Sequence, residues 1–197
     1  MRETVWGAFW NYQVTMFRYH STLEATHSFA SPWYEWPLDI RPIWYFAGDT
    51  QEGYSTISAF GNPLLWWAGI PALGAAACLW WKERFRWRGL VLAGFLSVYL
   101  PWVLVPRLTF IYHYFTAVPF LVVALCGVFS LLYQRGGFAR QLTFPGGIQC
   151  SGATLLLAAV TAACLLLFAV YFPVLSGSPT TRDYANALEL FETWYFA

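Results

Sequence analysis

Four long apolar segments fill the last two thirds of the chain and predict four membrane-spanning helices. They cover residues 61–81, 89–105, 115–133 and 148–172. A helix crosses the hydrocarbon core of a bilayer with about 20 apolar residues, so three segments are long enough and the second is slightly short. The pattern therefore predicts an all-α integral membrane protein in which residues 58–172 form a four-helix transmembrane region.

The basic residues between these segments predict how the helices are oriented. The first connection, residues 82–88, contains four Lys or Arg residues, and the third, residues 134–147, contains two. The second, residues 106–114, contains only Arg107. Lys and Arg concentrate in cytoplasmic loops, so the first and third connections are expected in the cytoplasm. The N-terminal third, the turn at Arg107 and the C-terminal region are then external or luminal.

Residues 1–57 precede the first predicted span and are interpreted as an external helix followed by a loop. Over residues 5–27, apolar and aromatic side chains recur at helical spacing, which indicates a helix lying in the membrane interface. Residues 28–46 contain three prolines and are expected to be extended. Beyond the last span, residues 173–197 are expected outside, and residues 180–197 are expected to form a helix capped at Thr180, with Tyr184, Leu188, Phe191 and Tyr195 at helical spacing.

The composition excludes several classes of function. The chain is 58% hydrophobic and 11% charged, and its net charge of +1 gives no reason to expect a nucleic-acid partner. The predicted spans carry almost no charge, which argues against an ion transporter. None of the four cysteines forms a CxxC pair or has a histidine nearby, so we interpret them as packing residues.

His20, Glu24 and His27 share one face of the predicted interfacial helix and form the strongest candidate for a metal site. The two histidines lie about 10.5 Å apart along the helix axis. Two nitrogens on one zinc ion lie within roughly 4 Å of each other. We therefore expect no metal here, and no motif predicts another cofactor.

Aromatic side chains alternate with Glu35, Asp39 and Arg41 in the proline-containing loop. Two interpretations fit this pattern. The rings can clamp the loop to the lipid headgroups as an aromatic belt. Alternatively, they form the wall of a site for a sugar or a lipid headgroup, in which flat rings supply apolar faces and polar groups orient hydroxyls.

Three stretches, taken in order, resemble a known family. Residues 19–38 read YHSTLEATHSFASPWYEWPL and are followed by RPIWY, residues 61–67 read GNPLLWW, and residues 106–115 read PRLTFIYHYF. Together they resemble the last external loop and the C-terminal four-helix region of the protein O-mannosyltransferase family. These are phospholipid-carrier-dependent glycosyltransferases of the GT-C type. The resemblance covers nearly the whole chain.

The resemblance implies transfer of mannose from a polyprenyl-phosphate carrier to Ser or Thr hydroxyls of an acceptor protein, with inversion at the sugar. The family's acidic catalytic motif lies in its N-terminal half and has no counterpart here, so no catalytic residue is assigned. Residues 1–57 must also cross the membrane before the first span, which favours the C-terminal part of a longer protein. We therefore expect no activity without a catalytic N-terminal half; the alternative is a non-enzymatic partner subunit or scaffold.

The residue chemistry within these stretches nominates site residues. Guanidinium and imidazole groups donate hydrogen bonds to phosphate, so the lipid-phosphate candidates are Arg107, Arg41 and His113. Candidates for the acceptor or sugar side are His20, His27, Trp33, Glu35 and Trp36. Arg107 has the alternative of snorkelling from a helix end, and His113 that of an ordinary interfacial residue.

The expected partners are membrane lipid, the lipid-linked sugar donor, the acceptor protein and a catalytic N-terminal half. The expected location is the cell membrane of a bacterium or the endoplasmic reticulum of a eukaryote.

Overall fold

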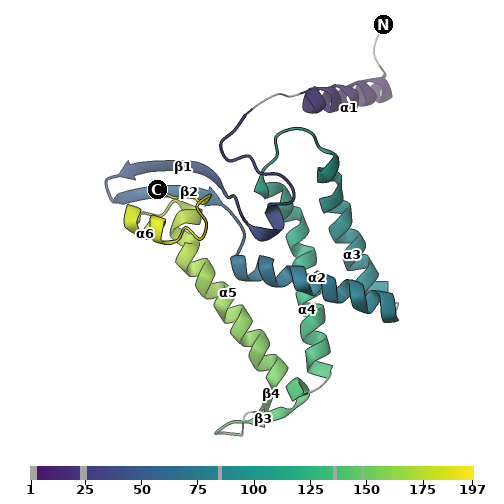
Figure 1. Ribbon diagram of the computed structural model, residues 1–197, viewed down its shortest axis with the longest axis vertical. Helices are drawn as coiled ribbons and strands as arrows, with labels where there is room; N and C mark the ends of the chain where they lie inside the picture. Colours follow the sequence, from purple (N-terminus) through teal and green to yellow (C-terminus); the bar gives the residue numbers. More distant parts are fainter. Residues whose placement is uncertain (1–3, 23–25, 84–85, 135–136, 148) are drawn as a thin grey trace.

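The computed structural model describes residues 4–22, 26–83, 86–134, 137–147 and 149–197 (Figure 1). The predictions that involve Glu24, Arg84 and Arg135 fall outside these residues.

The four predicted apolar helices are confirmed. The first is α2 (Pro63–Glu83), the second is α3 (Arg86–Tyr99) with the 3₁₀ turn η2 (Leu100–Leu104), the third is the 3₁₀ turn η3 (Ile111–Ala117) with α4 (Val118–Gln134), and the fourth is α5 (Gly152–Ser176). All four are long and apolar enough to cross a bilayer. The chain is therefore an integral membrane protein.

The ends of these helices follow local chemistry. Ser151 caps α5, because its side-chain oxygen accepts a hydrogen bond from the Thr154 backbone N–H over 3.1 Å. The same helix ends at Gly177, which adopts the left-handed conformation with φ of 75°. In the second span, Pro101 falls in the 3₁₀ turn η2, where it ends the regular α-helix.

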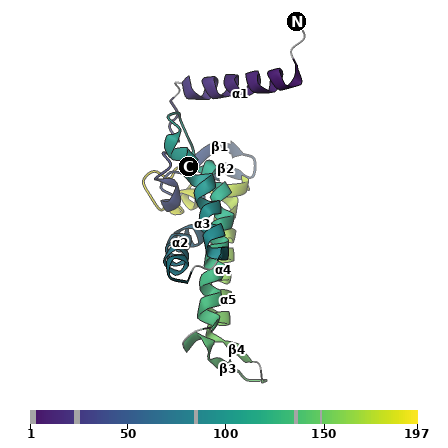
Figure 2. The ribbon, with the colours of Figure 1, turned by 90° about the vertical axis from the view of Figure 1, so that its right-hand side faces the viewer.

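The helices meet at different angles. α2 runs across α3 and α4 and packs against both, while α5 slants away from the others (Figures 1 and 2). Gly69 permits the crossing of α2 with α4, since a Cβ atom at that position would lie 2.9 Å from the Cβ atom of Leu121. Large apolar side chains on the outer face of α5, among them Leu165, Leu166 and Phe168, are exposed and suit contact with lipid.

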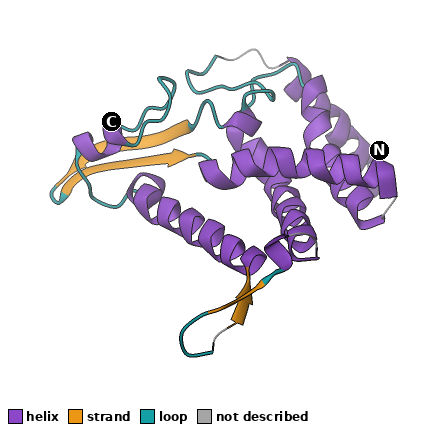
Figure 3. Cartoon of the chain, turned by 60° about the horizontal axis from the view of Figure 1, so that its bottom comes forward, coloured by secondary structure: helices purple, strands orange, loops and turns teal. Residues whose placement is uncertain are grey.

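The structure adds two β-hairpins that the sequence did not predict. Strands β1 (Ile43–Thr50) and β2 (Gly53–Ala59) pair antiparallel, in the segment where an extended loop was expected. This hairpin packs β2 against α5. A second hairpin, β3 (Gln141–Thr143) and β4 (Gln149–Ser151), lies between α4 and α5 at the opposite end of the molecule (Figure 3).

The N-terminal helix α1 (Val5–Thr22) stands apart from the rest of the fold and buries no residue. Figure 2 shows it crossing the direction of α3 and α4 at one end of the molecule. It is shorter than the predicted helix over residues 5–27. The hydroxyls of Ser21 and Thr22 donate to the backbone carbonyl of Arg18, over 3.1 and 2.8 Å, and such local bonds are common where a helix ends.

The C-terminal helix is also shorter than expected. α6 (Arg182–Ala187) is capped by Thr181 instead of Thr180. The remaining residues, 188–197, are named the C-terminal segment. They leave the helix because Trp194 and Phe196 are both fully buried in a cluster with Phe60, which a continuing helix does not allow.

Two apolar clusters hold the external regions to the helices. One surrounds Trp36, Ile111 and Tyr114 and joins the loop before β1 to α3, η3 and α4. The other surrounds Phe60 and Trp194 and joins the hairpin β1–β2, the end of α5 and the C-terminal segment. Segments far apart in the sequence therefore converge at one end of the molecule.

Candidate functional site

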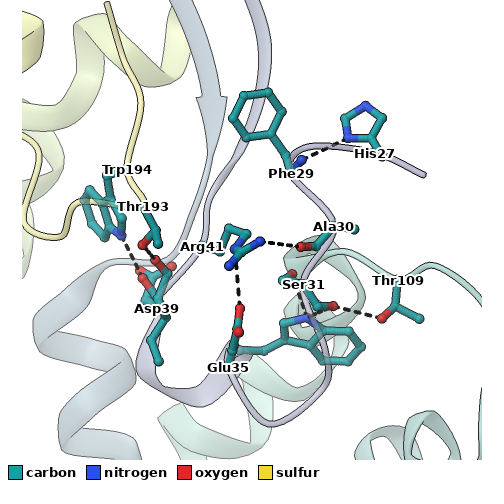
Figure 4. A network of polar contacts seen from close by, with 12 residues as sticks. His27, Phe29, Ala30, Ser31, Glu35, Asp39, Arg41, Thr109, Thr193 and Trp194 are labelled. Atoms are coloured by element: carbon teal, nitrogen blue, oxygen red, sulfur yellow. Dashed lines mark hydrogen bonds and ion pairs between the residues drawn. The ribbon is translucent and has the colours of Figure 1, made fainter.

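The site is built where two loops meet. We name residues 26–42 the aromatic loop and residues 105–110 the Arg107 turn. The backbone N–H of Ser31 donates to the carbonyl of Thr109 over 2.9 Å, and the Thr109 hydroxyl donates to the Ser31 carbonyl over 2.8 Å (Figure 4). Both residues are buried. The two regions predicted to lie outside the membrane are thus in direct contact.

Trp36 anchors the aromatic loop in the core. It is fully buried, and its Nε1–H donates to both the carbonyl and the hydroxyl oxygen of Ser31, over 3.1 and 3.0 Å. Its ring packs edge-on against Trp102, with centroids 5.8 Å apart. Because neither face of this ring is open, Trp36 shapes the site by holding Ser31 and has no exposed surface for a sugar.

Arg41 and Glu35 form an ion pair on the outer side of the same loop. The Nε atom of Arg41 lies 3.6 Å from Oε2 of Glu35, and Nη1 of Arg41 donates to the carbonyl of Ala30 over 3.3 Å (Figure 4). The two side chains are 35% and 18% exposed. The charge of Arg41 is therefore compensated by its neighbour.

A small polar pocket opens beside Arg41. It has a volume of about 150 Å³ and is lined by Ser28, Phe29, Arg41, Thr193 and Tyr195. A wider depression of about 480 Å³, lined by Thr26, His27, Ser28 and Phe29, shares two of these residues. Together they form a continuous polar surface with aromatic sides, which suits a hydroxyl-bearing or peptide ligand.

Thr193 and Tyr195 were not predicted as site residues. Their signal in the sequence is the alternation of Thr193, Trp194, Tyr195 and Phe196, which is typical of an extended segment with one buried side. That pattern had been interpreted as part of a helix.

Arg107 lies in the Arg107 turn, and His113 lies in η3 just after it. Arg107 is partly exposed and makes no hydrogen bond or ion pair with any residue that the structure describes. His113 stacks on Trp102 with ring centroids 4.0 Å apart, and its buried Nε2 atom has no partner among the described residues. Among the residues that the structure describes, Arg107 therefore keeps an uncompensated positive charge just before the start of a span.

The other predicted residues occupy different places. His20 lies on α1, away from the two loops, and contacts Tyr19. His27 is exposed and packs its ring against Phe110 of the Arg107 turn, with centroids 5.1 Å apart. Trp33 packs on Tyr99, whose hydroxyl donates to the Trp33 carbonyl over 3.0 Å. The structure therefore brings His27 to the site and leaves His20 outside it.

Asp39 of the aromatic loop is buried. It has no exposed surface, and Oδ2 accepts a hydrogen bond from the Gly61 backbone N–H over 3.1 Å, while Oδ1 has no partner among the described residues. Its backbone has a left-handed φ of 57°. Burial raises the pKa of Asp39 to about 8, so the side chain is largely an uncharged acid near neutral pH.

The helices also enclose an apolar groove away from the loops. It has a volume of about 660 Å³ between α2 and α3 and is lined entirely by apolar or aromatic residues, including Leu73, Gly74, Trp81 and Leu92. Within the described part of the chain, no group of three or more His, Cys, Asp or Glu side chains is arranged to hold a metal ion.

Comparison with known proteins gives one consistent result. A family model described as the C-terminal four-transmembrane region of protein O-mannosyltransferase matches residues 5–194. The polyprenol-phosphate-mannose–protein mannosyltransferase of Mycobacterium tuberculosis (strain CDC 1551 / Oshkosh) is 28% identical over 202 residues, which cover 94% of this chain and 36% of that protein. The dolichyl-phosphate-mannose–protein mannosyltransferase 1 of Saccharomyces cerevisiae is 22% identical over 204 residues, covering 91% and 22%.

The fold has a counterpart among solved structures. The chain aligns with the S. cerevisiae protein O-mannosyltransferase Pmt1–Pmt2 complex bound to the sugar donor, with a TM-score of 0.77 and 21% identity. The alignment covers 98% of this chain and 27% of that one. This similarity concerns the fold alone. The chain spans only about a third of the length of the mycobacterial relatives.

Proposed function

Because the chain belongs to the protein O-mannosyltransferase family, whose C-terminal four-transmembrane region matches residues 5–194, we propose that it is the membrane module of such an enzyme. In this role it binds a polyprenyl-phosphate-mannose donor and supports transfer of the mannose to Ser or Thr hydroxyls of an acceptor protein. In this proposal the catalytic carboxylate is supplied from an N-terminal half, where the family carries its acidic motif. In the aromatic loop, Asp39 is buried and Glu35 is paired with Arg41.

The observation that carries this proposal is the partly exposed guanidinium of Arg107, which makes no ion pair within the described part of the chain and lies two residues before Thr109 of the Ser31–Thr109 contact. In the transfer, the acceptor oxygen attacks the anomeric carbon and the bond from that carbon to the phosphate oxygen breaks. The polyprenyl phosphate leaves with an additional negative charge, and the hydroxyl proton passes to the catalytic carboxylate. A guanidinium without a competing carboxylate stabilises that charge by charge-assisted hydrogen bonds.

The other predicted site residues are assigned either to the lipid-linked donor or to the acceptor protein. We assign His113 to the donor side as a residue that supports Arg107, because its partly exposed ring stacks on Trp102 just after the Arg107 turn. Arg41, Glu35 and His27 border the polar surface and are assigned to the acceptor side. Trp33 and Trp36 support this surface from the core, and His20 has no contact that supports a direct role.

The proposed topology places both loops outside the cytoplasm. The basic residues of the first and third connections face the cytoplasm in this arrangement, as the charge pattern predicts. The hairpin β3–β4 lies at the end opposite the site (Figure 1), which agrees with this assignment. The helix α1 lies on the outer membrane surface.

The proposal is tested by a transfer assay with purified components. The chain is reconstituted in lipid nanodiscs with polyprenyl-phosphate-[³H]mannose and a Ser/Thr peptide, alone and with the N-terminal half of a mycobacterial relative. We expect transfer only in the combined sample. Transfer by the chain alone would show that it carries its own base. Absence of transfer in both, with confirmed association of the two halves, would favour a non-enzymatic partner subunit or scaffold.

A further inference from the structure

We propose that the C-terminal segment forms one wall of the acceptor site and that Asp39 is the positioning residue that holds it there. This inference rests on the proposed function for the identity of the ligand. The docking of the segment itself is a separate property that can be measured without any transfer reaction.

The C-terminal segment presents two different sides. Thr193 and Tyr195 line the polar pocket beside Arg41. The residues that alternate with them in the sequence, Trp194 and Phe196, are fully buried. Alternate residues of an extended chain point in opposite directions. The burial of the two large rings therefore fixes which side chains face the pocket.

The segment is attached at several points to elements distant in sequence. Trp194 donates from Nε1 to the backbone carbonyl of Asp39 over 2.9 Å, and the Thr193 hydroxyl donates to the carbonyl of Ile40 (Figure 4). The hydroxyl of Tyr54 in β2 donates a hydrogen bond to the carbonyl of Phe196 over 3.0 Å. Two of these hydrogen bonds are accepted by neighbouring backbone carbonyls, those of Asp39 and Ile40.

The segment bonds to the backbone carbonyl of Asp39, and the buried side chain of the same residue bonds to Gly61, so a charge on that side chain would disfavour the packing that holds the carbonyl in place. The carboxyl group has no exposed surface, makes one hydrogen bond to Gly61 and leaves Oδ1 without a partner among the described residues. The cluster next to it consists of rings such as Phe60 and Trp194. A buried carboxylate with one donor is strongly disfavoured in such surroundings.

Within the described part of the chain, no Lys, Arg or His is hydrogen-bonded or ion-paired to the Asp39 carboxyl group. The other titratable residues on the elements around Asp39 are Cys164 and Tyr171 of α5, Tyr54 of β2, Glu189, Glu192 and Tyr195 of the C-terminal segment, and His27, Tyr34, Glu35 and Arg41 of the aromatic loop. Arg41 is the one Lys or Arg among these described residues, and it is paired with Glu35.

Docking of the segment is therefore expected to depend on pH. The pKa of Asp39 is about 8 in the folded state, against an ordinary value of 3.8 when the residue is exposed to water. The folded, docked state binds the proton more tightly, so docking is strongest at low pH and weakens as the pH rises from about 4 to about 8.

The chemistry of the pocket favours the acceptor polypeptide over the donor phosphate. The charge of Arg41 is compensated by Glu35, whereas that of Arg107 is not compensated within the described residues. The hydroxyls of Ser28 and Thr193 and the rings of Phe29 and Tyr195 complete the lining. Neutral hydrogen-bonding groups such as peptide carbonyls and side-chain hydroxyls match this surface better than an anion.

The docking claim is tested by hydrogen exchange of residues 188–197 in the full chain, measured in nanodiscs at pH 5 and pH 8. After correction for the intrinsic exchange rate, protection in the wild type is expected to fall severalfold at pH 8. Asp39→Asn mimics the uncharged acid and should keep its protection at both values. Asp39→Ala should lose protection at both. An Asp39→Asn chain with the same pH dependence as the wild type would overturn the role of Asp39.

The ligand claim is tested in the complemented transfer assay. Loss of one contact costs about fivefold to tenfold in affinity, so Tyr195→Ala should raise the KM for the acceptor peptide by that factor. The KM for the donor should stay unchanged. Leu190→Ala, a half-exposed residue of the same segment outside the pocket, should change neither value. A rise in the donor KM, or no change in either, would overturn the assignment.

These two experiments separate the inference from the proposed function. If no complemented sample transfers mannose while Asp39→Asn removes the pH dependence of exchange, the docking holds and the assigned substrate is wrong.

Discussion

Ser31 and Thr109 are 78 residues apart in the chain and exchange two hydrogen bonds, of 2.9 and 2.8 Å. The first of these residues is buried in the aromatic loop, and the second is buried two residues after Arg107. This contact fixes the position of the Arg107 turn relative to the polar surface, so the spacing between the proposed donor and acceptor sites depends on it.

Thr109→Val removes the hydroxyl that donates to the Ser31 carbonyl while it keeps the side-chain shape. Loss of this bond should destabilise the chain by about 1 kcal/mol and weaken donor binding, because the Arg107 turn is held less firmly. Thermal unfolding in detergent and donor titration measure the two effects. Ser97→Ala removes an exposed hydroxyl that bonds only within its own turn of α3, so it should change neither quantity. Equal effects of the two variants would contradict the proposed role of Thr109.

The burial of Asp39 predicts a pH dependence of stability. Because its folded pKa of about 8 lies above its ordinary value of 3.8, stability is highest at low pH and is lost as the pH rises through this range. Asp39→Asn should remove this slope and raise the Tm by a few °C at pH 8. Scanning calorimetry of both chains from pH 4 to pH 8 measures it. Parallel curves for the two chains would show that another group is responsible.

Substitution of glycine by alanine is expected to have different effects on stability at two positions in neighbouring helices. A Cβ atom at Gly94 of α3 would lie 2.1 Å from the ring of Phe120 in α4. Gly94→Ala should therefore destabilise the chain by about 1–3 kcal/mol. At Gly74 of α2 a Cβ atom meets nothing within 4 Å, so Gly74→Ala should be neutral or slightly stabilising. Denaturation in detergent compares the two, and similar losses would contradict the packing of α3 on α4.

The topology predicts which positions are reachable from each side of the membrane. In a chain whose four native cysteines are replaced by alanine, Arg107→Cys should react with an impermeant maleimide added outside. Arg86→Cys should react only after the membrane is opened. Labelling in the reverse order would invert the topology and move the proposed site to the cytoplasm.

The helices could be predicted from the sequence because long apolar runs are a local property. The hairpin β1–β2 could not, since Tyr45 and Phe46 are both exposed and give β1 no alternating pattern. Its stability comes from pairing with β2 and from the packing of β2 on α5, and these contacts are distant in sequence.

The site could be predicted only in outline. The motifs indicated the aromatic loop and the Arg107 turn, and the structure shows them in contact. The burial of Asp39 and the participation of Thr193 and Tyr195 depend on how the C-terminal segment folds back, which no short motif encodes.

The binding of the lipid-linked donor to this chain tests the central proposal most directly. We would measure the Kd for polyprenyl-phosphate-mannose in nanodiscs for the wild type, Arg107→Gln and the control Arg140→Gln, which changes a residue at the opposite end of the molecule. Loss of a charge-assisted contact should weaken binding about tenfold to a hundredfold for Arg107→Gln and leave the control unchanged. Equal affinities for all three chains would contradict a phosphate site at Arg107.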